Sequence, residues 1–290
     1  MTPGHGKRGV LEGVMGLRRV FSSLVPRRTA AEAPPAAGTL GLREFLRRSG
    51  RFRRWLNRIK AGINGGDFGG WYPYDSFSNF FALKRILGGH PELFQQLGGD
   101  GPVADVGCAD GDLSFFLESL GCKVHAIDHP APNYNAMQGV KALKAALASA
   151  VEIYEIDLDS QFRLPAERYA LVLFFGTLYH LKNPFGVLET LARHASCCLL
   201  STRVARYTPD RQVRFEDRPM AYLLDEREAN NDPTNYWIFS NTGLRRLLKR
   251  AGWEVLGFCN TGNTADSDPA SPERDERAFC LVRSRQLACL

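Results

Sequence analysis

The stretch DVGCADGD, residues 105–112, has the composition of a loop that binds a ligand through its backbone. Gly107 and Gly111 are glycines of such a loop, and Ala109 stands between them. A loop that binds pyrophosphate has the spacing GxGxxG and leaves the following helix N-terminus free for the anion. Here the spacing is one residue too short, and two aspartates at the helix start repel a phosphate. The pattern indicates a ligand that carries positive charge and no phosphate.

S-adenosylmethionine fits these requirements. It carries a sulfonium and an ammonium, which Asp110 and Asp112 would attract, and its carboxylate can accept backbone N–H groups. A second acid, Asp128, ends the next apolar run 17 residues after Gly111, where a carboxylate can accept both ribose hydroxyls. After the third run, Asp157 can reach the adenine amine while the backbone of Leu158 meets a ring nitrogen. The alternatives are a dinucleotide enzyme and a coincidental turn.

Three candidate residues follow the fourth and fifth apolar runs. Methyl transfer needs a nucleophile held in line with the methyl group, and in some cases a group that removes a proton. His180 can act as general base or orient the acceptor, or it can be a structural histidine. Tyr179 can line the methyl pocket or belong to the core. Arg203 can bind an anionic group of the substrate or form a salt bridge.

Two further segments are expected near the substrate. Residues 71–81, WYPYDSFSNFF, are dense in aromatics, and Trp71 and Tyr72 can stack on a base or planar substrate. They can also close over the cofactor or belong to the core; we favour a lid formed by residues 63–101. Residues 206–234 are polar and interrupt the regular pattern, which indicates an insertion near the substrate or a disordered segment.

Charge is distributed unevenly along the chain. The first 60 residues contain 14 Lys or Arg and 3 Glu, whereas the remaining 230 contain 23 basic and 28 acidic residues. We therefore expect a basic N-terminal extension, residues 1–62, partly helical or disordered. Such an extension suits nucleic acid or an anionic membrane, or is a solvated tail. Its Arg-rich, acid-poor start is also typical of an organelle transit peptide.

Within this extension, residues 42–59 have apolar residues on one stripe and arginines elsewhere. This spacing predicts a basic amphipathic helix. The helix would lie on a membrane, lie on RNA or cap the core. We favour capping, because its aromatic side chains need burial.

The seven cysteines form no CxxC pair, and the sequence shows no secretory signal. Together with the absence of an 18-residue apolar run, this favours a cytoplasmic protein without a transmembrane segment and without a zinc site. The oligomeric state stays open.

From residue 102 onward, short apolar runs alternate with helical patterns. This alternation predicts an α/β fold with a Rossmann-like, mostly parallel sheet covered by helices on both faces. The last two apolar runs, at residues 253–259 and 277–283, have no helix between them and predict an antiparallel edge. Residues 102–290 are thus expected to form one core. In such a sheet the ligand binds beyond the carboxyl ends of the strands, where the loop at 105–112 lies.

Residues 102–202 resemble the core of the class I S-adenosylmethionine-dependent methyltransferases. The motifs that carry the resemblance are VADVGCADG, KVHAID, YEIDLD and LFFGTLYHLKNP. The resemblance implies a seven-stranded sheet with an antiparallel last strand. It also implies that Asp105, Gly107 and Gly111 bind the amino-acid part of the cofactor and that Asp128 binds the ribose. Ala109 departs from the commoner glycine of that family.

A narrower resemblance concerns the bacterial tRNA wobble-uridine enzymes that form 5-oxyacetyluridine. The motifs GTLYHLKNP, NYWIFSNTGLRRLLKRAGWEV and ERAFCLVR are similar to theirs. Those enzymes use carboxy-S-adenosylmethionine, and the resemblance implies that Tyr179 and Arg277 hold its extra carboxylate. They also use a lysine before the core, near a tryptophan. The stretch GGDFGGWYPYDSF has none, which favours plain S-adenosylmethionine.

These observations predict an S-adenosylmethionine-dependent methyltransferase. Its acceptor is a wobble-uridine hydroxyl in tRNA, or a small-molecule or lipid-linked hydroxyl. The alternative from another class is a non-catalytic binding protein that keeps the fold.

Overall fold

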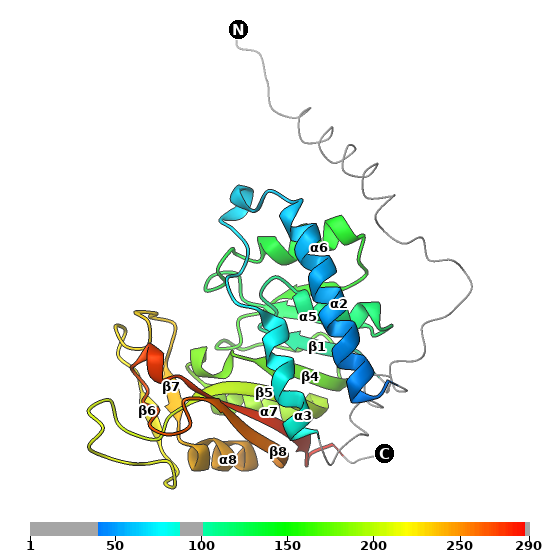
Figure 1. Cartoon of the computed structure of the whole chain (residues 1–290). Helices are drawn as coiled ribbons and strands as arrows, with labels where there is room; N and C mark the ends of the chain where they lie inside the picture. The colour runs from blue at the N-terminus through cyan, green and yellow to red at the C-terminus, as the bar shows by residue number, and fades with distance from the viewer. Residues whose placement is uncertain (1–39, 88–100, 288–290) are drawn as a thin grey trace. The chain divides into compact units, whose positions relative to one another are not determined.

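The computed structural model of the chain describes residues 40–87 and 101–287 (Figure 1). Most of the predicted N-terminal extension therefore lies outside the described residues. The described helices are α2 (Leu42–Ala61), η2 (Gly65–Phe68), η3 (Ser76–Ala82), α3 (Leu83–Ile86), α5 (Asp112–Ser119), α6 (Gln138–Leu147), η4 (Leu178–His180), α7 (Pro184–His194), α8 (Asn241–Arg250) and η5 (Pro272–Arg274). The described strands are β1 (Val103–Val106), β2 (Val124–Asp128), β3 (Glu152–Glu155), β4 (Tyr169–Phe175), β5 (Ala195–Val204), β6 (Ala221–Leu223), β7 (Trp237–Phe239), β8 (Trp253–Gly262) and β9 (Glu276–Ser284).

One sheet organises these elements. Five parallel strands run in the order β3-β2-β1-β4-β5, β9 lies antiparallel beside β5, and β8 lies antiparallel beside β9. This confirms the prediction of a mostly parallel Rossmann-like sheet with an antiparallel last strand. The prediction of seven strands was too low, because β7 pairs with the end of β5 and β6 pairs with β7. These two three-residue strands are too short to leave a periodic pattern in the sequence.

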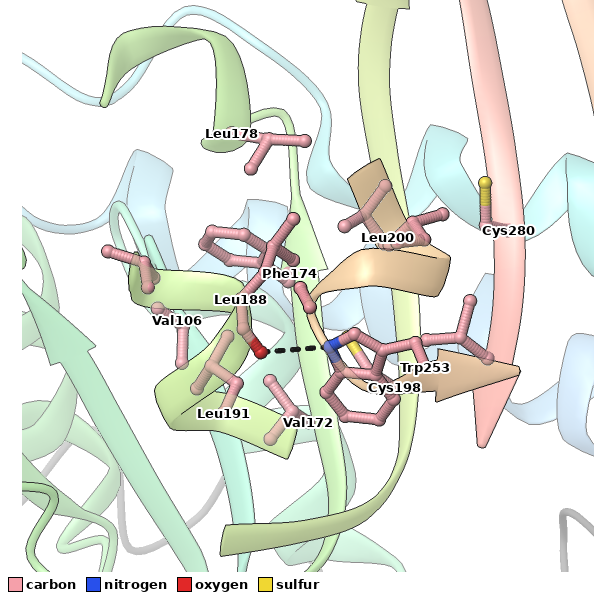
Figure 2. Packing of buried hydrophobic residues seen from close by; sticks show 14 of the residues in the cluster. Val106, Val172, Phe174, Leu178, Leu188, Leu191, Cys198, Leu200, Trp253 and Cys280 are labelled. Carbon is pink, nitrogen blue, oxygen red and sulfur yellow. Dashed lines mark hydrogen bonds between the residues drawn. The ribbon is translucent and has the colours of Figure 1, made fainter. Parts of the chain in front are cut away.

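Helices α7 and α8 cover one face of the sheet. Figure 2 shows Trp253 at this interface, where its indole Nε1–H donates to the Leu188 carbonyl of α7 at 2.9 Å. Leu191 of α7, Phe174 of β4 and Cys198 of β5 are fully buried in the same cluster. Because β4 is buried along nearly its whole length, its sequence is a continuous apolar run without alternation.

Helix α2 covers the opposite face together with η3 and α5. Phe45 and Phe52 of α2 contact Phe116 of α5, with ring centroids 5.2 and 5.5 Å apart. Phe77 and Phe80 of η3 contact the same Phe116 ring. The apolar stripe of α2 thus caps the core, and the arginines of this helix lie outside that contact.

The buried Trp253 gives a prediction about stability. Trp253→Ala should lower the free energy of unfolding by about 3–5 kcal/mol, because it opens a large cavity and leaves the Leu188 carbonyl without its donor. Urea denaturation monitored by circular dichroism measures this change. Leu223→Ala, at a side chain that is 59% exposed, should change the value by less than about 0.5 kcal/mol. Equal effects of the two substitutions would contradict this account of the core.

Candidate functional site

The glycines of the 105–112 loop are required by its geometry. Gly107 has φ +76° and Gly111 has φ +78°, a conformation that side chains disfavour. A Cβ atom on Gly107 would lie 2.0 Å from the Oγ1 atom of Thr177, which follows β4. Ala109 also adopts a left-handed conformation, with φ +52°, so the alanine at this position strains the backbone by about 1 kcal/mol.

Asp128, at the end of β2, fixes the loop to the sheet. Its Oδ2 atom accepts hydrogen bonds from the Ala109 backbone N–H at 2.8 Å and from Asn133 Nδ2 at 3.0 Å. Its Oδ1 atom accepts the His129 backbone N–H at 2.8 Å. Burial raises the pKa of Asp128, although these hydrogen bonds act in the opposite direction. The carboxylate keeps acceptor capacity for one further donor.

Asp110 and Asp112 are paired with a lysine of the protein itself. Lys60, at the end of α2, places its Nζ atom 3.0 Å from Asp110 Oδ2 and 2.7 Å from Asp112 Oδ1. Asp110 also accepts the Tyr72 backbone N–H at 2.8 Å and Asn135 Nδ2 at 2.8 Å. The attraction of these two aspartates for a cationic ligand, expected from the sequence, is thus partly offset by a cation of the protein. They bind a lysine that lies about 50 residues earlier in the chain.

The same lysine contacts an aromatic side chain of the segment 71–81. The Nζ atom of Lys60 lies 5.1 Å from the centroid of the Trp71 ring. The charge of Lys60 is already shared between two carboxylates, Asp110 and Asp112.

Asp105 is a buried carboxylate without an ionic partner. It lies on β1 and accepts the Ser114 hydroxyl of α5 at 2.6 Å. Burial, only partly offset by that hydrogen bond, raises the pKa of Asp105 to about 7. Within residues 40–87 and 101–287, neither Asp105 nor Asp128 forms an ion pair with Lys, Arg or His. A buried and a half-buried carboxylate at the carboxyl ends of β1 and β2 are thus available to a ligand that brings hydroxyl or ammonium donors.

The residues after β3 lie at the same edge of the sheet. Asp157 is partly exposed, accepts the Asp159 backbone N–H at 2.9 Å, and lies 3.7 Å from Nδ1 of His129. The Leu158 side chain is buried in the core, so only its backbone is available to a ligand. Both residues remain predicted contacts of the adenine.

Tyr179 and His180 form the end of η4, directly after the Thr177 contact with the loop. Their rings stack with centroids 4.2 Å apart. The Nδ1 atom of His180 lies 3.0 Å from the Thr234 hydroxyl, and that hydroxyl donates to Asp232 Oδ1 at 2.6 Å. Burial lowers the pKa of His180, while the charge of Asp232 raises it to a lesser extent. Asp232 and Thr234 were not predicted from the sequence, because no local pattern links them to a residue more than 50 positions earlier.

The segment that carries these two residues is packed. Residues 206–234 include β6, and Phe215 and Leu224 form a small buried cluster with Ile238 of β7. Tyr179 packs against this cluster, and its carbonyl accepts the Tyr236 backbone N–H at 2.8 Å. These contacts hold the segment against η4.

The two arginines singled out in the sequence have different surroundings. Arg203 is 4% exposed; its Nε atom lies 3.1 Å from Asp275 and its Nη2 atom donates to the Ser271 carbonyl. The salt bridge that the sequence analysis gave as the alternative for Arg203 is thus present, and the role of Arg203 in binding substrate stays a prediction. Arg277 pairs with it across β5 and β9, and its guanidinium lies 5.8 Å from the Tyr179 ring centroid. Arg277 therefore lies beside η4 and remains a predicted substrate contact.

Tyr72 lies near Asp128 on one side of the site and near Tyr179 and Asp232 on the other. Burial raises its pKa to about 12, and the nearby Tyr179, Asp128 and Asp232 act in the same direction. Its ring contacts those of Tyr74 and Tyr134, and both of these side chains are more than half exposed. Since the Tyr72 backbone is also bonded to Asp110, the aromatic segment is held over the loop, as a lid would be.

The order of the strands is that of a Rossmann-like α/β protein. Its candidate site lies beyond the carboxyl ends of β1, β2 and β4. A family model described as a methyltransferase domain matches residues 80–257, and the chain belongs to this family. The prediction of an S-adenosylmethionine-dependent methyltransferase is thereby confirmed at the level of the class. The comparisons support the methyltransferase domain and not the narrower resemblance to the wobble-uridine enzymes.

Solved structures agree with this fold. The N-terminal domain of EvdMO1 with SAH bound is 17% identical, with a TM-score of 0.50, over 87% of this chain and 100% of that chain. The same domain in the presence of SAH and D-fucose is 18% identical, with a TM-score of 0.52 and the same coverage. No curated protein matches the sequence significantly. Across residues 40–87 and 101–287, no helix has the length and apolar character needed to cross a membrane.

The Lys60 pairing gives a testable prediction. Lys60→Met should destabilise the protein by about 3 kcal/mol at pH 7.5, because it leaves two buried carboxylates unpaired. The pKa of Asp112 is already raised by burial, and loss of the lysine raises it further. A folded-state pKa above the unfolded value means that protonation favours the native state, so the deficit should shrink as the pH falls toward 5.5.

Urea denaturation of the variant and the wild type across this pH range measures the deficit. In the Lys60→Met background, Asp112→Asn should recover part of the lost stability. If the loss of stability is the same at pH 7.5 and pH 5.5, and Asp112→Asn recovers none of it, the loss of charge pairing is not its cause.

Proposed function

We propose that the chain transfers the methyl group of S-adenosylmethionine to a hydroxyl of its acceptor, with His180 as the general base. The observation that carries this proposal is the contact between Gly107 and Thr177. It places η4, with Tyr179 and His180, directly beside the glycine loop. A proton acceptor and a cofactor site on one edge of the sheet are what methyl transfer to a hydroxyl requires.

The carboxylates without an ion pair in the described residues support a set of cofactor contacts. Asp105 would face the ammonium group and Asp128 the ribose hydroxyls, with Gly107, Ala109 and Gly111 forming the backbone cradle. Asp157 and the Leu158 backbone would meet the adenine. The bound cofactor supplies an activated methyl group on its sulfonium, so the protein needs no further electrophile.

The chain's own groups then align the acceptor and move one proton. His180 Nε2 would take the hydroxyl proton as the acceptor oxygen forms its bond to the methyl carbon. The carbon–sulfur bond breaks and its electron pair stays on sulfur, which becomes a neutral thioether. Tyr179 and Tyr72 would exclude water, and Trp71 and Arg277 would contact the acceptor.

Asp105 gives a test of the cofactor site. Asp105→Asn should weaken S-adenosylmethionine binding at least tenfold at pH 8, about 1.4 kcal/mol, because the ammonium loses its counter-charge. The same change should not lower the melting temperature at pH 8, since an acid with a raised folded-state pKa destabilises the native state when it is ionised. Isothermal titration calorimetry and differential scanning fluorimetry measure the two effects. Asp217→Asn, at an exposed site, is the control and should change neither.

Label transfer tests the reaction itself. The protein is incubated with methyl-labelled S-adenosylmethionine and with separate RNA and small-molecule fractions of a cell extract. The wild type should label one fraction, and His180→Gln should bind cofactor normally but transfer at least about 100-fold more slowly. Cofactor binding without transfer to any fraction would favour the non-catalytic alternative.

A wobble-uridine hydroxyl in tRNA is the second candidate acceptor, and the surface of α2 favours it. Arg43, Arg47, Arg51, Arg54 and Arg58 are all exposed, and their spacing of three and four residues places them on one face. In the described part of the chain, only Arg47 of these five has an ion-pair partner, Glu44. A row of free guanidinium groups suits a phosphate backbone.

Salt-dependent binding to tRNA tests this candidate. Replacing Arg51, Arg54 and Arg58 by Gln should weaken binding and reduce the slope of log K against log salt by about 2. Replacing Arg246, Lys249 and Arg250 of α8, which are equally exposed, is the matched control and should have little effect. Fluorescence anisotropy with labelled tRNA measures both. If the two triple variants behave alike, α2 carries no tRNA site and the small-molecule or lipid-linked hydroxyl is favoured.

The identity of the cofactor is a separate question. Carboxy-S-adenosylmethionine would need cations for its extra carboxylate, and Lys60 is already bound to two aspartates, whereas Arg277 shares Asp275 through its Nε atom. These pairings favour plain S-adenosylmethionine. Mass spectrometry of small molecules released from the purified protein distinguishes the two cofactors.

A further inference from the structure

The surroundings of His180 Nδ1 determine which ring nitrogen carries the proton. Two oxygens lie within hydrogen-bond distance of it: the Thr234 hydroxyl at 3.0 Å and the Thr234 carbonyl at 3.2 Å. The carbonyl can only accept. The hydroxyl has one proton, and it donates that proton to Asp232 Oδ1 at 2.6 Å, so its oxygen accepts from the imidazole.

Both neighbours of Nδ1 are thus acceptors, and the neutral ring must carry its proton there. Nε2 is then left with the lone pair. Within the described residues no hydrogen-bond partner contacts Nε2. Nε2 is also not among the buried side-chain atoms that lack a hydrogen-bond partner. The basic nitrogen of the ring is therefore the one that is open to a ligand.

We infer that Asp232 and Thr234 are positioning residues that hold His180 as its Nδ1–H tautomer and present Nε2 to the acceptor. This inference rests on the proposed function for its catalytic meaning, but the hydrogen-bond arrangement exists without any ligand. Asp232 is fixed in turn, because its Oδ1 atom also accepts the Thr234 backbone N–H at 2.9 Å. The stacked Tyr179 ring restricts the rotation of the imidazole.

The groups around His180 also change the proton affinity of its imidazole. The groups that face His180 are the Asp232 carboxylate, the Arg277 guanidinium and the Tyr179 ring. Burial and Arg277 lower its pKa, whereas Asp232 raises it. Asp232 therefore stabilises the imidazolium that forms when Nε2 takes a proton, and it keeps the base from becoming too weak to act.

Histidine NMR on the full chain tests this inference without cofactor or acceptor. The protein is labelled with 15N-histidine, and long-range 1H–15N spectra are recorded from pH 5 to pH 8.5. The chain contains six histidines, so the His180 signal is assigned by its loss in His180→Gln. The expected spectrum at high pH is that of a single Nδ1–H tautomer.

Variants then separate the two positioning residues. Asp232→Asn should shift the His180 pKa downward, because the counter-charge is lost while an amide oxygen can still accept from Thr234. Thr234→Val should give a mixture of tautomers, because one of the two acceptors is lost, and Thr234→Ser should restore the single tautomer. Asp217→Asn, in the same segment, is the matched control and should leave the His180 signal unchanged.

An Nε2–H tautomer in the wild type, or a His180 pKa that Asp232→Asn does not lower, would overturn the inference. Neither result depends on cofactor binding, so it would leave the proposed methyl transfer to be judged by calorimetry and label transfer. A failure of label transfer with the expected tautomer in place would likewise refute the proposed function alone.

Discussion

The contact of Lys60 with Asp110 and Asp112 is the constraint on which the site depends. Two carboxylates at the start of α5 need a cation, and α2 provides it from its last turn. The charge contact fixes one end of α2, and the aromatic contacts of Phe45 with Phe116 fix the rest. Because residues 71–81 follow α2 after a short connection that contains η2, the same contacts restrict where this aromatic segment lies.

This pairing divides the acidic residues of the loop and of the neighbouring end of β2 into two classes. Asp110 and Asp112 are ion-paired within the protein. Asp105 is buried and Asp128 half-buried, and both have hydrogen bonds but no ion pair in the described residues. Burial makes ionised carboxylates costly, and a ligand that brings donors or a positive charge reduces that cost. The electrostatic preference of the loop for a cationic cofactor thus comes from its second class of aspartates.

The parts of this structure that could be predicted are those with a local pattern. Continuous apolar strands such as β4, separated by helices, reveal a parallel sheet, and the loop spacing reveals the kind of ligand. The Lys60 pairing and the interior position of Arg203 could not be predicted, because they join residues 50 or more positions apart. Strands β6 and β7 were missed for a different reason: three residues are too few to show alternation.

The segment 206–234 shows why a polar sequence can still be packed against the proposed site. Its few apolar side chains, among them Phe215 and Leu224, are enough to fix it against β7. Once fixed, the segment leaves its polar residues at the surface that faces η4, where Asp232 and Thr234 meet His180. In the proposed mechanism, η4 after β4 supplies the base, and the segment 206–234 sets its tautomer. The chemistry of His180 therefore depends on the insertion as much as on the fold that carries the histidine.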